Sequence, residues 1–269
     1  MKKALILIFS FCLLAFHSFS QQNFVQEPGV QKGYLSLSLG GAFPVGGYAS
    51  RNSQDPTSGL ANPGGLIDLS YILPVKNSPF AFKVSLRGRF NPIDAAADIA
   101  PLAASNPGYQ WSEGKASWKT AALMVGTYYH CPVAKRWEFN AYVLAGAADS
   151  KLPAYTVMGI KTDPDPSQEG FVQLSTSKVS AISFSELIGA GFSYRLARQF
   201  SLLANIGFWG LVPTFKNETV RETVVDGLNV PNVFTVSNSL NPIVANDHTF
   251  NYGQPMNTID FSVGVAMRL

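Results

Sequence analysis

Residues 258–269, at the carboxyl terminus, read TIDFSVGVAMRL, and in this stretch apolar side chains alternate with polar or small ones. The apolar set is Ile259, Phe261, Val263, Val265, Met267 and Leu269. A period of two places successive side chains on opposite faces of a β-strand. The stretch therefore predicts a strand with one face for an apolar phase and one for a polar or ionic interior.

Seven further segments carry the same strand signal, and the connections between them alternate in length. The segments are 33–43, 66–73, 80–90, 118–130, 137–146, 183–196 and 200–209. Three connections are short (74–79, 132–136 and 197–199) and four are long (44–64, 91–115, 150–178 and 211–257). This alternation predicts eight antiparallel strands in up-and-down order, with all the long connections at one end. In 118–130 both faces are mostly apolar, so the pattern leaves open which face points outward.

Two of the long connections contain β-prone stretches of their own. Residues 155–160 and 171–175 predict one hairpin, and 220–225 with 233–236, around Asp226 and Gly227, predict another. We expect both hairpins to project beyond the eight strands. If they entered the wall instead, the barrel would have ten or more strands.

The first twenty residues have the form of a cleaved export signal. Lys2 and Lys3 precede the apolar run 4–16, and the segment ends in Ser18, Phe19 and Ser20, a small-x-small cleavage pattern. The apolar run is shorter than the roughly 20 residues that a membrane-spanning helix needs. Phe11 stands before Cys12 where a lipoprotein signal requires a small residue, so we expect no lipidation.

The composition after removal of residues 1–20 fits a barrel wall that faces lipid. The full chain carries 20 basic and 17 acidic residues, and removing two lysines leaves a formal charge of +1, which gives no electrostatic case for nucleic acid. Charged residues make up 14 %, against roughly 25 % in soluble domains. Only Cys131 is left, so an intramolecular disulfide is excluded.

These observations predict an all-β protein: one antiparallel, up-and-down transmembrane β-barrel over residues 21–269, in the outer membrane. A bilayer is spanned by about 9 to 11 tilted strand residues, and an open sheet edge in lipid would leave polar groups unsatisfied. The first and last strands must therefore pair. Both termini, the segment 21–32 and the short turns are expected in the periplasm, and the long loops outside the cell.

Charged residues on the polar faces of the strands are the candidate site. They are Asp68, Lys83, Arg87, Arg89, Glu138, Arg195, Asp260 and Arg268. An eight-stranded barrel has an interior that side chains can fill, so we expect these charges to pair and plug it. The alternative is a narrow path for ions or small solutes, in which Arg87 and Arg89 would favour anions. Glu186 falls on the apolar face, which predicts a place near the rim or a bulge.

Aromatic residues near the strand ends are expected to form the girdles of the two membrane interfaces. They are Tyr34, Tyr71, Phe80, Phe90, Trp118, Tyr128, Tyr129, Trp137, Tyr194, Phe200, Phe208 and Trp209. A second set in or beside the loops offers a stacking platform for a glycan or peptide: Tyr48, Tyr109, Trp111, Tyr155 and Phe234.

No motif for catalysis, a cofactor or a metal appears in the sequence. Apart from the leader, the chain has two histidines: His130, at a strand end on the periplasmic side, and His248, beside Asp247 in the last long loop. One adjacent acid–histidine pair is a very weak signal, so we expect no enzyme, no cofactor and no metal site.

Residues 37–46, LSLGGAFPVG, and 261–269, FSVGVAMRL, resemble the outer-membrane β-barrel superfamily of Gram-negative bacteria. That superfamily includes OmpA-like and OmpW-like small barrels and porin-family barrels. The resemblance implies outer-membrane lipid and the barrel-assembly machinery as partners during biogenesis. The last strand departs from the family pattern because it ends in Leu269 instead of an aromatic residue.

Four functions are compatible with this pattern. The first is a structural or interaction role: membrane integrity, surface contact, or a subunit of an envelope complex with an extracellular or envelope protein partner. The second is a narrow channel for ions or small solutes. A soluble lipocalin-like carrier, with its apolar face turned inward, and an outer-membrane enzyme that uses His248 complete the set.

Overall fold

The computed structural model describes residues 33–52, 55, 57–162, 171–225 and 244–269. The expected signal peptide, 1–20, and the segment 21–32 lie outside these residues and stay predictions. Within the described part, no helix combines the length and the apolarity that crossing a membrane requires.

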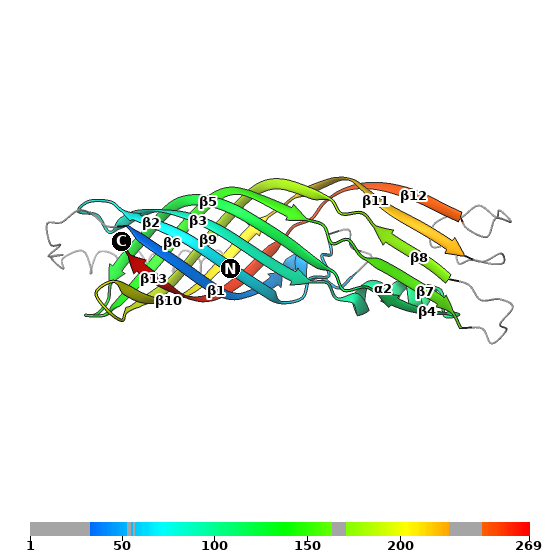
Figure 1. Ribbon diagram of the computed structural model, residues 1–269, viewed down its shortest axis with the longest axis horizontal. Helices are drawn as coiled ribbons and strands as arrows, with labels where there is room; N and C mark the ends of the chain where they lie inside the picture. The colour runs from blue at the N-terminus through cyan, green and yellow to red at the C-terminus, as the bar shows by residue number, and fades with distance from the viewer. Residues whose placement is uncertain (1–32, 53–54, 56, 163–170, 226–243) are drawn as a thin grey trace, which may run out of the picture. The chain divides into compact units, whose positions relative to one another are not determined.

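Eight long strands form a closed antiparallel barrel (Figure 1). Each barrel strand pairs with the barrel strands before and after it in the chain, and the last pairs with the first, which confirms the predicted up-and-down topology. The strands are β1 (Tyr34–Val45), β2 (Gly64–Pro74), β3 (Phe80–Pro92), β5 (Ser117–Pro132), β6 (Trp137–Lys151), β9 (Ser180–Arg195), β10 (Phe200–Leu211) and β13 (Asn257–Arg268).

The strand register fixes the geometry of the barrel. Following paired residues once around the wall, from Tyr34 through Ile72, Lys83, Gly126, Leu144, Leu187, Trp209 and Thr258, returns to β1 at Pro44. The register thus closes with a stagger of ten residues, and a stagger of this kind tilts the strands against the barrel axis. The tilt is visible in Figure 1.

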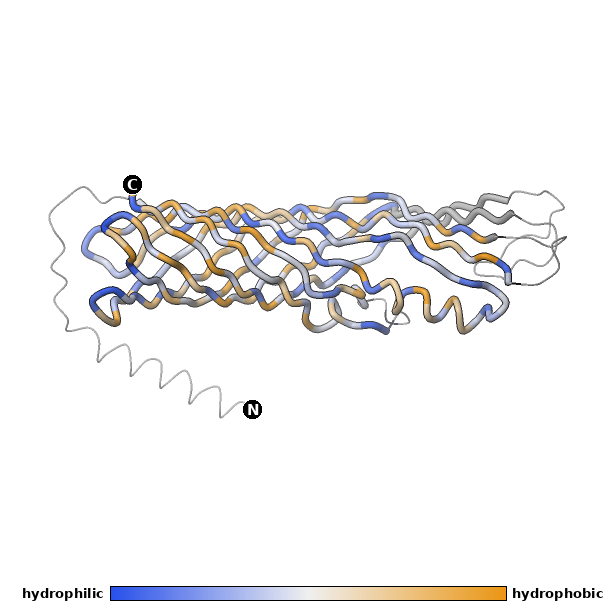
Figure 2. Tube along the Cα trace, turned by 60° about the horizontal axis from the view of Figure 1, so that its bottom comes forward, coloured by the Kyte–Doolittle hydropathy of each residue, from blue (hydrophilic) through white to orange (hydrophobic). Residues whose placement is uncertain are grey.

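The wall is apolar outside and polar inside, as the period of two predicts. On β3 the exposed fraction alternates, from 59 % at Phe82 to 7 % at Lys83. On β5, where the sequence left the parity open, Leu123 and Val125 point outward while Ala122 and Met124 are buried. In Figure 2 apolar residues recur throughout the barrel part of the chain.

Aromatic residues divide between the wall and the interior. At the end of the barrel with the short turns, Phe80 packs on Tyr129 and Trp137 on Tyr194, with ring centroids 5.4 and 5.0 Å apart. The girdle prediction is wrong for Trp118, Tyr128 and Trp209, because these three side chains are buried inside. A bulky ring near a strand end can fill the mouth of a barrel as well as face the interface.

Five strands form a second, open sheet in the order β12-β11-β8-β7-β4. They are β4 (Tyr109–Glu113), β7 (Thr156–Lys161), β8 (Phe171–Thr176), β11 (Thr214–Val225) and β12 (Val244–Gly253). The expected hairpin of 155–160 with 171–175 is confirmed, as β7 and β8. The other expected hairpin, of 220–225 with 233–236, is wrong, because residues 220–225 belong to β11, which pairs with β12 on one side and β8 on the other. Residues 233–236 themselves lie outside the described part.

One helix, α2 (Ala95–Ser105), covers part of this sheet, and a short 3-10 turn, η1 (Gly46–Ala49), follows β1. The Asp94 side chain accepts a hydrogen bond from the backbone N–H of Ala97 and caps the helix. Ile99 and Leu102 of α2 pack against the buried sheet residues Trp111, Val157, Val172 and Leu174. None of these five strands joins the barrel wall, so the strand count stays at eight.

Candidate functional site

A buried ion-pair network occupies the middle of the barrel interior. The Arg87 guanidinium donates to Asp260 Oδ2 at 2.6 Å and to Asp68 Oδ2 at 3.2 Å. Asp68 also accepts hydrogen bonds from the hydroxyls of Ser70 and Ser85. Because β2, β3 and β13 supply the three charged side chains, the network joins the first strands of the barrel to the last.

Arg89, two residues further along β3, closes the interior toward the long-loop end. Its guanidinium lies 4.3 Å from the ring centroid of Trp209 and 5.4 Å from that of Tyr48. It donates to Thr258 Oγ1 and to the carbonyl of Met256, both at 2.7 Å. Buried apolar side chains from η1, β5 and β11 complete this closure: Tyr48, Trp118 and Phe215.

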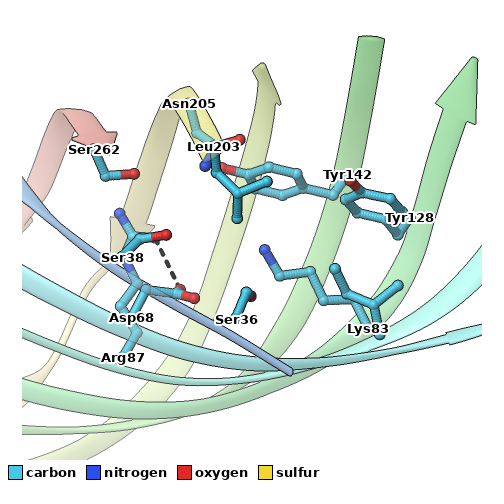
Figure 3. A pocket seen from close by; sticks show the side chains of 11 residues that line it. Ser36, Ser38, Asp68, Lys83, Arg87, Tyr128, Tyr142, Leu203, Asn205 and Ser262 are labelled. Carbon is cyan, nitrogen blue, oxygen red and sulfur yellow. Dashed lines mark hydrogen bonds and ion pairs between the residues drawn. The ribbon is translucent and has the colours of Figure 1, made fainter. Parts of the chain in front are cut away.

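Lys83, four residues from Arg87 in the opposite direction, lines a small polar cavity. Its ammonium lies 4.1 Å from the centroid of the Tyr142 ring, and Tyr142 stacks on Tyr128. Figure 3 shows Lys83, Tyr142 and the Asp68–Arg87 pair around the same space.

The other three predicted site residues lie at the short-turn end, away from this network. The oxygen Glu138 Oε1 is 3.7 Å from His130 Nδ1, and both side chains are partly exposed. Arg195 and Arg268 are exposed at the ends of β9 and β13. The structure therefore brings together Asp68, Lys83, Arg87, Arg89 and Asp260, and leaves the remaining three outside that buried group.

Glu186 lies on the outer face of the wall. The pairing of β9 with both neighbours runs through it without a shift of register, so the expected bulge is absent at this position. The exposed apolar side chains Phe184 and Ile188 flank it along the strand. Its carboxylate lies beside Gly210, where a Cβ atom would come within 3.2 Å of Oε1.

The proposed aromatic platform is not assembled in the described part of the loops. Tyr48 is buried in the barrel mouth and Trp111 under α2, while Tyr109 and Tyr155 pack against the Trp111 cluster. Phe234 lies outside the described residues. His248 belongs to β12, where its backbone pairs with Val220. Among the described residues, no group of three or more His, Cys, Asp or Glu is placed to hold a metal ion.

One acidic side chain of the open sheet, Glu113, has a strongly raised pKa. Partial burial, together with the nearby carboxylates of Asp98 and Asp94, raises the pKa of Glu113 from 4.5 to about 7. Neither carboxylate oxygen of Glu113 has a hydrogen-bond partner within the described residues. Burial also raises the pKa of Asp98.

The chain matches no protein-family model and no curated protein by sequence. Solved structures with a similar fold include a major outer membrane protein of Thermus thermophilus, at 14 % identity and a TM-score of 0.43, covering 88 % of this chain and 99 % of that one. Neisserial surface protein A matches at 7 % identity and a TM-score of 0.41, covering 90 % and 100 %. Ail, the attachment invasion locus protein of Yersinia pestis, matches at 11 % identity and a TM-score of 0.38, covering 88 % and 99 %.

Proposed function

We propose that this chain, which has the closed eight-stranded fold of small outer-membrane β-barrel proteins, is exported to the outer membrane and serves there in surface contact with a protein partner. The export signal predicted over residues 1–20 and an outer wall of apolar side chains support the location. By the rule that short turns face the periplasm, the open five-stranded sheet lies outside the cell.

The open edge of that sheet is the observation that carries the proposal. The backbone N–H of Gly114 donates to the carbonyl of Thr156, and the backbone N–H of Thr162 donates to the carbonyl of Gly108. Every second residue of an antiparallel strand points its backbone groups to the same side, so Gln110 and Ser112 of β4 also point theirs toward β7. The backbone groups of Trp111 and Glu113 point the other way, where no described strand pairs with them. Such an edge can accept a strand from another protein.

The filled interior supports surface contact over conduction. Two arginines occupy the lumen at successive levels of β3. Arg87 is paired with the carboxylates of Asp68 and Asp260, and Arg89 lies between the rings of Trp209 and Tyr48. Water that passed along the axis would have to break these contacts. No observation in the described residues favours the channel or the enzyme as a second function.

The experiment is photocrosslinking on intact cells that express the full chain. A photoreactive amino acid at Ser112, on β4, is expected to give one discrete adduct of higher mass, and the same amino acid at Lys76, in the turn between β2 and β3, is the matched control. Absence of an adduct at Ser112, or the same adduct from Lys76, would contradict contact through the open sheet.

A further inference from the structure

A small cavity, whose lining side chains are shown in Figure 3, lies in the barrel interior beside Asp68 and Lys83. Its volume is about 10 Å³, which is room for one water molecule or one monatomic ion. Polar side chains line it from several strands, among them Ser38, Lys83, Tyr142, Asn205 and Ser262. A cavity this polar is not expected to stay empty.

Lys83 is the residue that gives the cavity its chemistry. It is 7 % exposed, and its ammonium has no hydrogen-bond or ion-pair partner within the described residues. The Tyr142 ring covers one side of it at 4.1 Å. An ammonium group withdrawn from water without a hydrogen-bonded counter-charge costs several kcal/mol, so a partner is expected.

The neighbouring carboxylates are already engaged. Asp68 lines the same cavity and attracts Lys83 through space, but its two oxygens accept from Ser70, Ser85 and Arg87. Asp260 binds Arg87 through Oδ2; its Oδ1 has no partner, but this residue does not line the cavity. The buried charged side chains of the described barrel are three cations and two carboxylates, an excess of one positive charge.

The remaining polar groups around the cavity can donate hydrogen bonds. The hydroxyls of Ser38 and Ser262 and the amide of Asn205 make no hydrogen bond with another described residue, and all three line the space that Lys83 faces. Donors converging on one buried cation are a site for an acceptor of negative charge.

We propose that this lumen cavity binds one small monovalent anion, of which chloride is the common case, as the counter-ion of Lys83. The single excess charge calls for one negative charge, and a cavity this small favours a monatomic ion over phosphate or sulfate. Bound there, the ion neutralises Lys83 and accepts from the hydroxyls and the amide. The bound anion is a component of the folded barrel, and its binding does not depend on a protein partner outside the cell.

The test uses bromide, which replaces chloride and scatters X-rays anomalously. Crystals of the refolded full barrel in sodium bromide are expected to show one anomalous peak beside the Lys83 ammonium. Lys83→Met should lose this peak. Lys119→Met, which removes an exposed lysine at the rim of β5, should keep it. In solution, chloride is expected to raise the midpoint of thermal unfolding above that in gluconate at equal ionic strength, and Lys83→Met to abolish the difference.

Asn205→Leu is a second variant for the case in which Lys83→Met does not fold. It keeps the lysine, removes the amide donor, and should weaken the bromide peak. A water molecule in the cavity of bromide-soaked wild-type crystals, or a bromide peak of unchanged height in Lys83→Met or Asn205→Leu, would overturn the proposal. Because the photocrosslinking of Ser112 reports on a different part of the molecule, either proposal can fail without the other.

Discussion

At the scale of single residues, Arg87 is the side chain on which the barrel interior most depends. It bridges Asp68 and Asp260, which come from the second and the last strands of the barrel, and all three side chains are buried. Removing one partner of a buried ion pair leaves the others charged and unpaired. The penalty then falls on the folded state alone.

We predict that Arg87→Met lowers the free energy of unfolding by about 3–5 kcal/mol, as expected when a buried pair loses one partner. Urea unfolding of the refolded barrel in lipid vesicles, followed by tryptophan fluorescence, measures this loss. Arg51→Met is the control: its partner is Asp94 at 3.0 Å, but the arginine is 68 % exposed, so the expected change is about 0–1 kcal/mol. Equal losses in the two variants would show that the network does not stabilise the barrel.

Glu113 gives the open sheet a pH dependence whose sign is fixed by the raised pKa. The folded sheet holds the proton up to about pH 7, whereas the unfolded chain releases it near the ordinary pKa of 4.5. The contribution of Glu113 to the stability of the sheet is therefore complete below pH 4.5 and is lost as the pH rises toward 7. We predict that the corrected hydrogen-exchange protection of β4 and β7 is greater at pH 5 than at pH 8.

Glu113→Gln carries no charge at either pH and should remove this difference while the protection of the barrel strands stays the same. A Glu113→Gln sheet with the wild-type pH dependence would assign the effect to another group, with Asp98 as the next candidate.

At the scale of elements, the sequence predicts the barrel strands to within a few residues, because each has one face in contact with an apolar phase. The period of two fails on β5, where Ala122 and Met124 fill the interior with apolar groups and both faces look alike. The girdle prediction is wrong for Trp118 and Trp209 for a related reason. Their position near a strand end does not reveal whether the ring points in or out.

The open sheet was only partly predictable from the sequence. β7 and β8 form a local hairpin with a clear turn signal between them. The remaining pairings join distant segments, such as β11 with β8, and β4 is five residues long. For the interior, the period of two predicts which residues lie on the polar face. It does not predict that Arg87, and not Lys83, pairs with both Asp68 and Asp260, because this pairing depends on the register between strands.

The open sheet should lose stability independently of the barrel. Leu174 is buried among Trp111, Val157 and Val172. Leu174→Ala is expected to cost the sheet about 2–5 kcal/mol, as for other buried leucines, and to lower protection in β7 and β8. Ile160→Ala, at an exposed position of β7, is the control that should change little. Loss of the heat-dependent gel shift of the barrel in Leu174→Ala would show that the two sheets fold as one unit.

At the scale of the whole molecule, the filled lumen predicts a barrel that does not conduct. Wild-type protein in planar bilayers should show no reproducible conductance steps. Trp209→Ala removes a fully buried ring that stacks on Arg89 and should cost about 3–5 kcal/mol. Because the Trp209 ring packs against Arg89 in the lumen, brief openings are expected in this variant. A stable wild-type pore would contradict a lumen plugged by Arg87 and Arg89.

In the proposed outer-membrane barrel, the apolar face of the wall meets lipid and the polar face meets the interior. The most direct measurement is methyl NMR of the unsubstituted protein in lipid nanodiscs, on the strand where the sequence left the parity open. Cross-relaxation with lipid acyl chains is expected for the methyl groups of Leu123 and Val125 and not for those of Ala122 and Met124. Lipid contacts at Ala122 and Met124 instead, or at none of the four residues, would contradict a wall whose apolar face meets lipid.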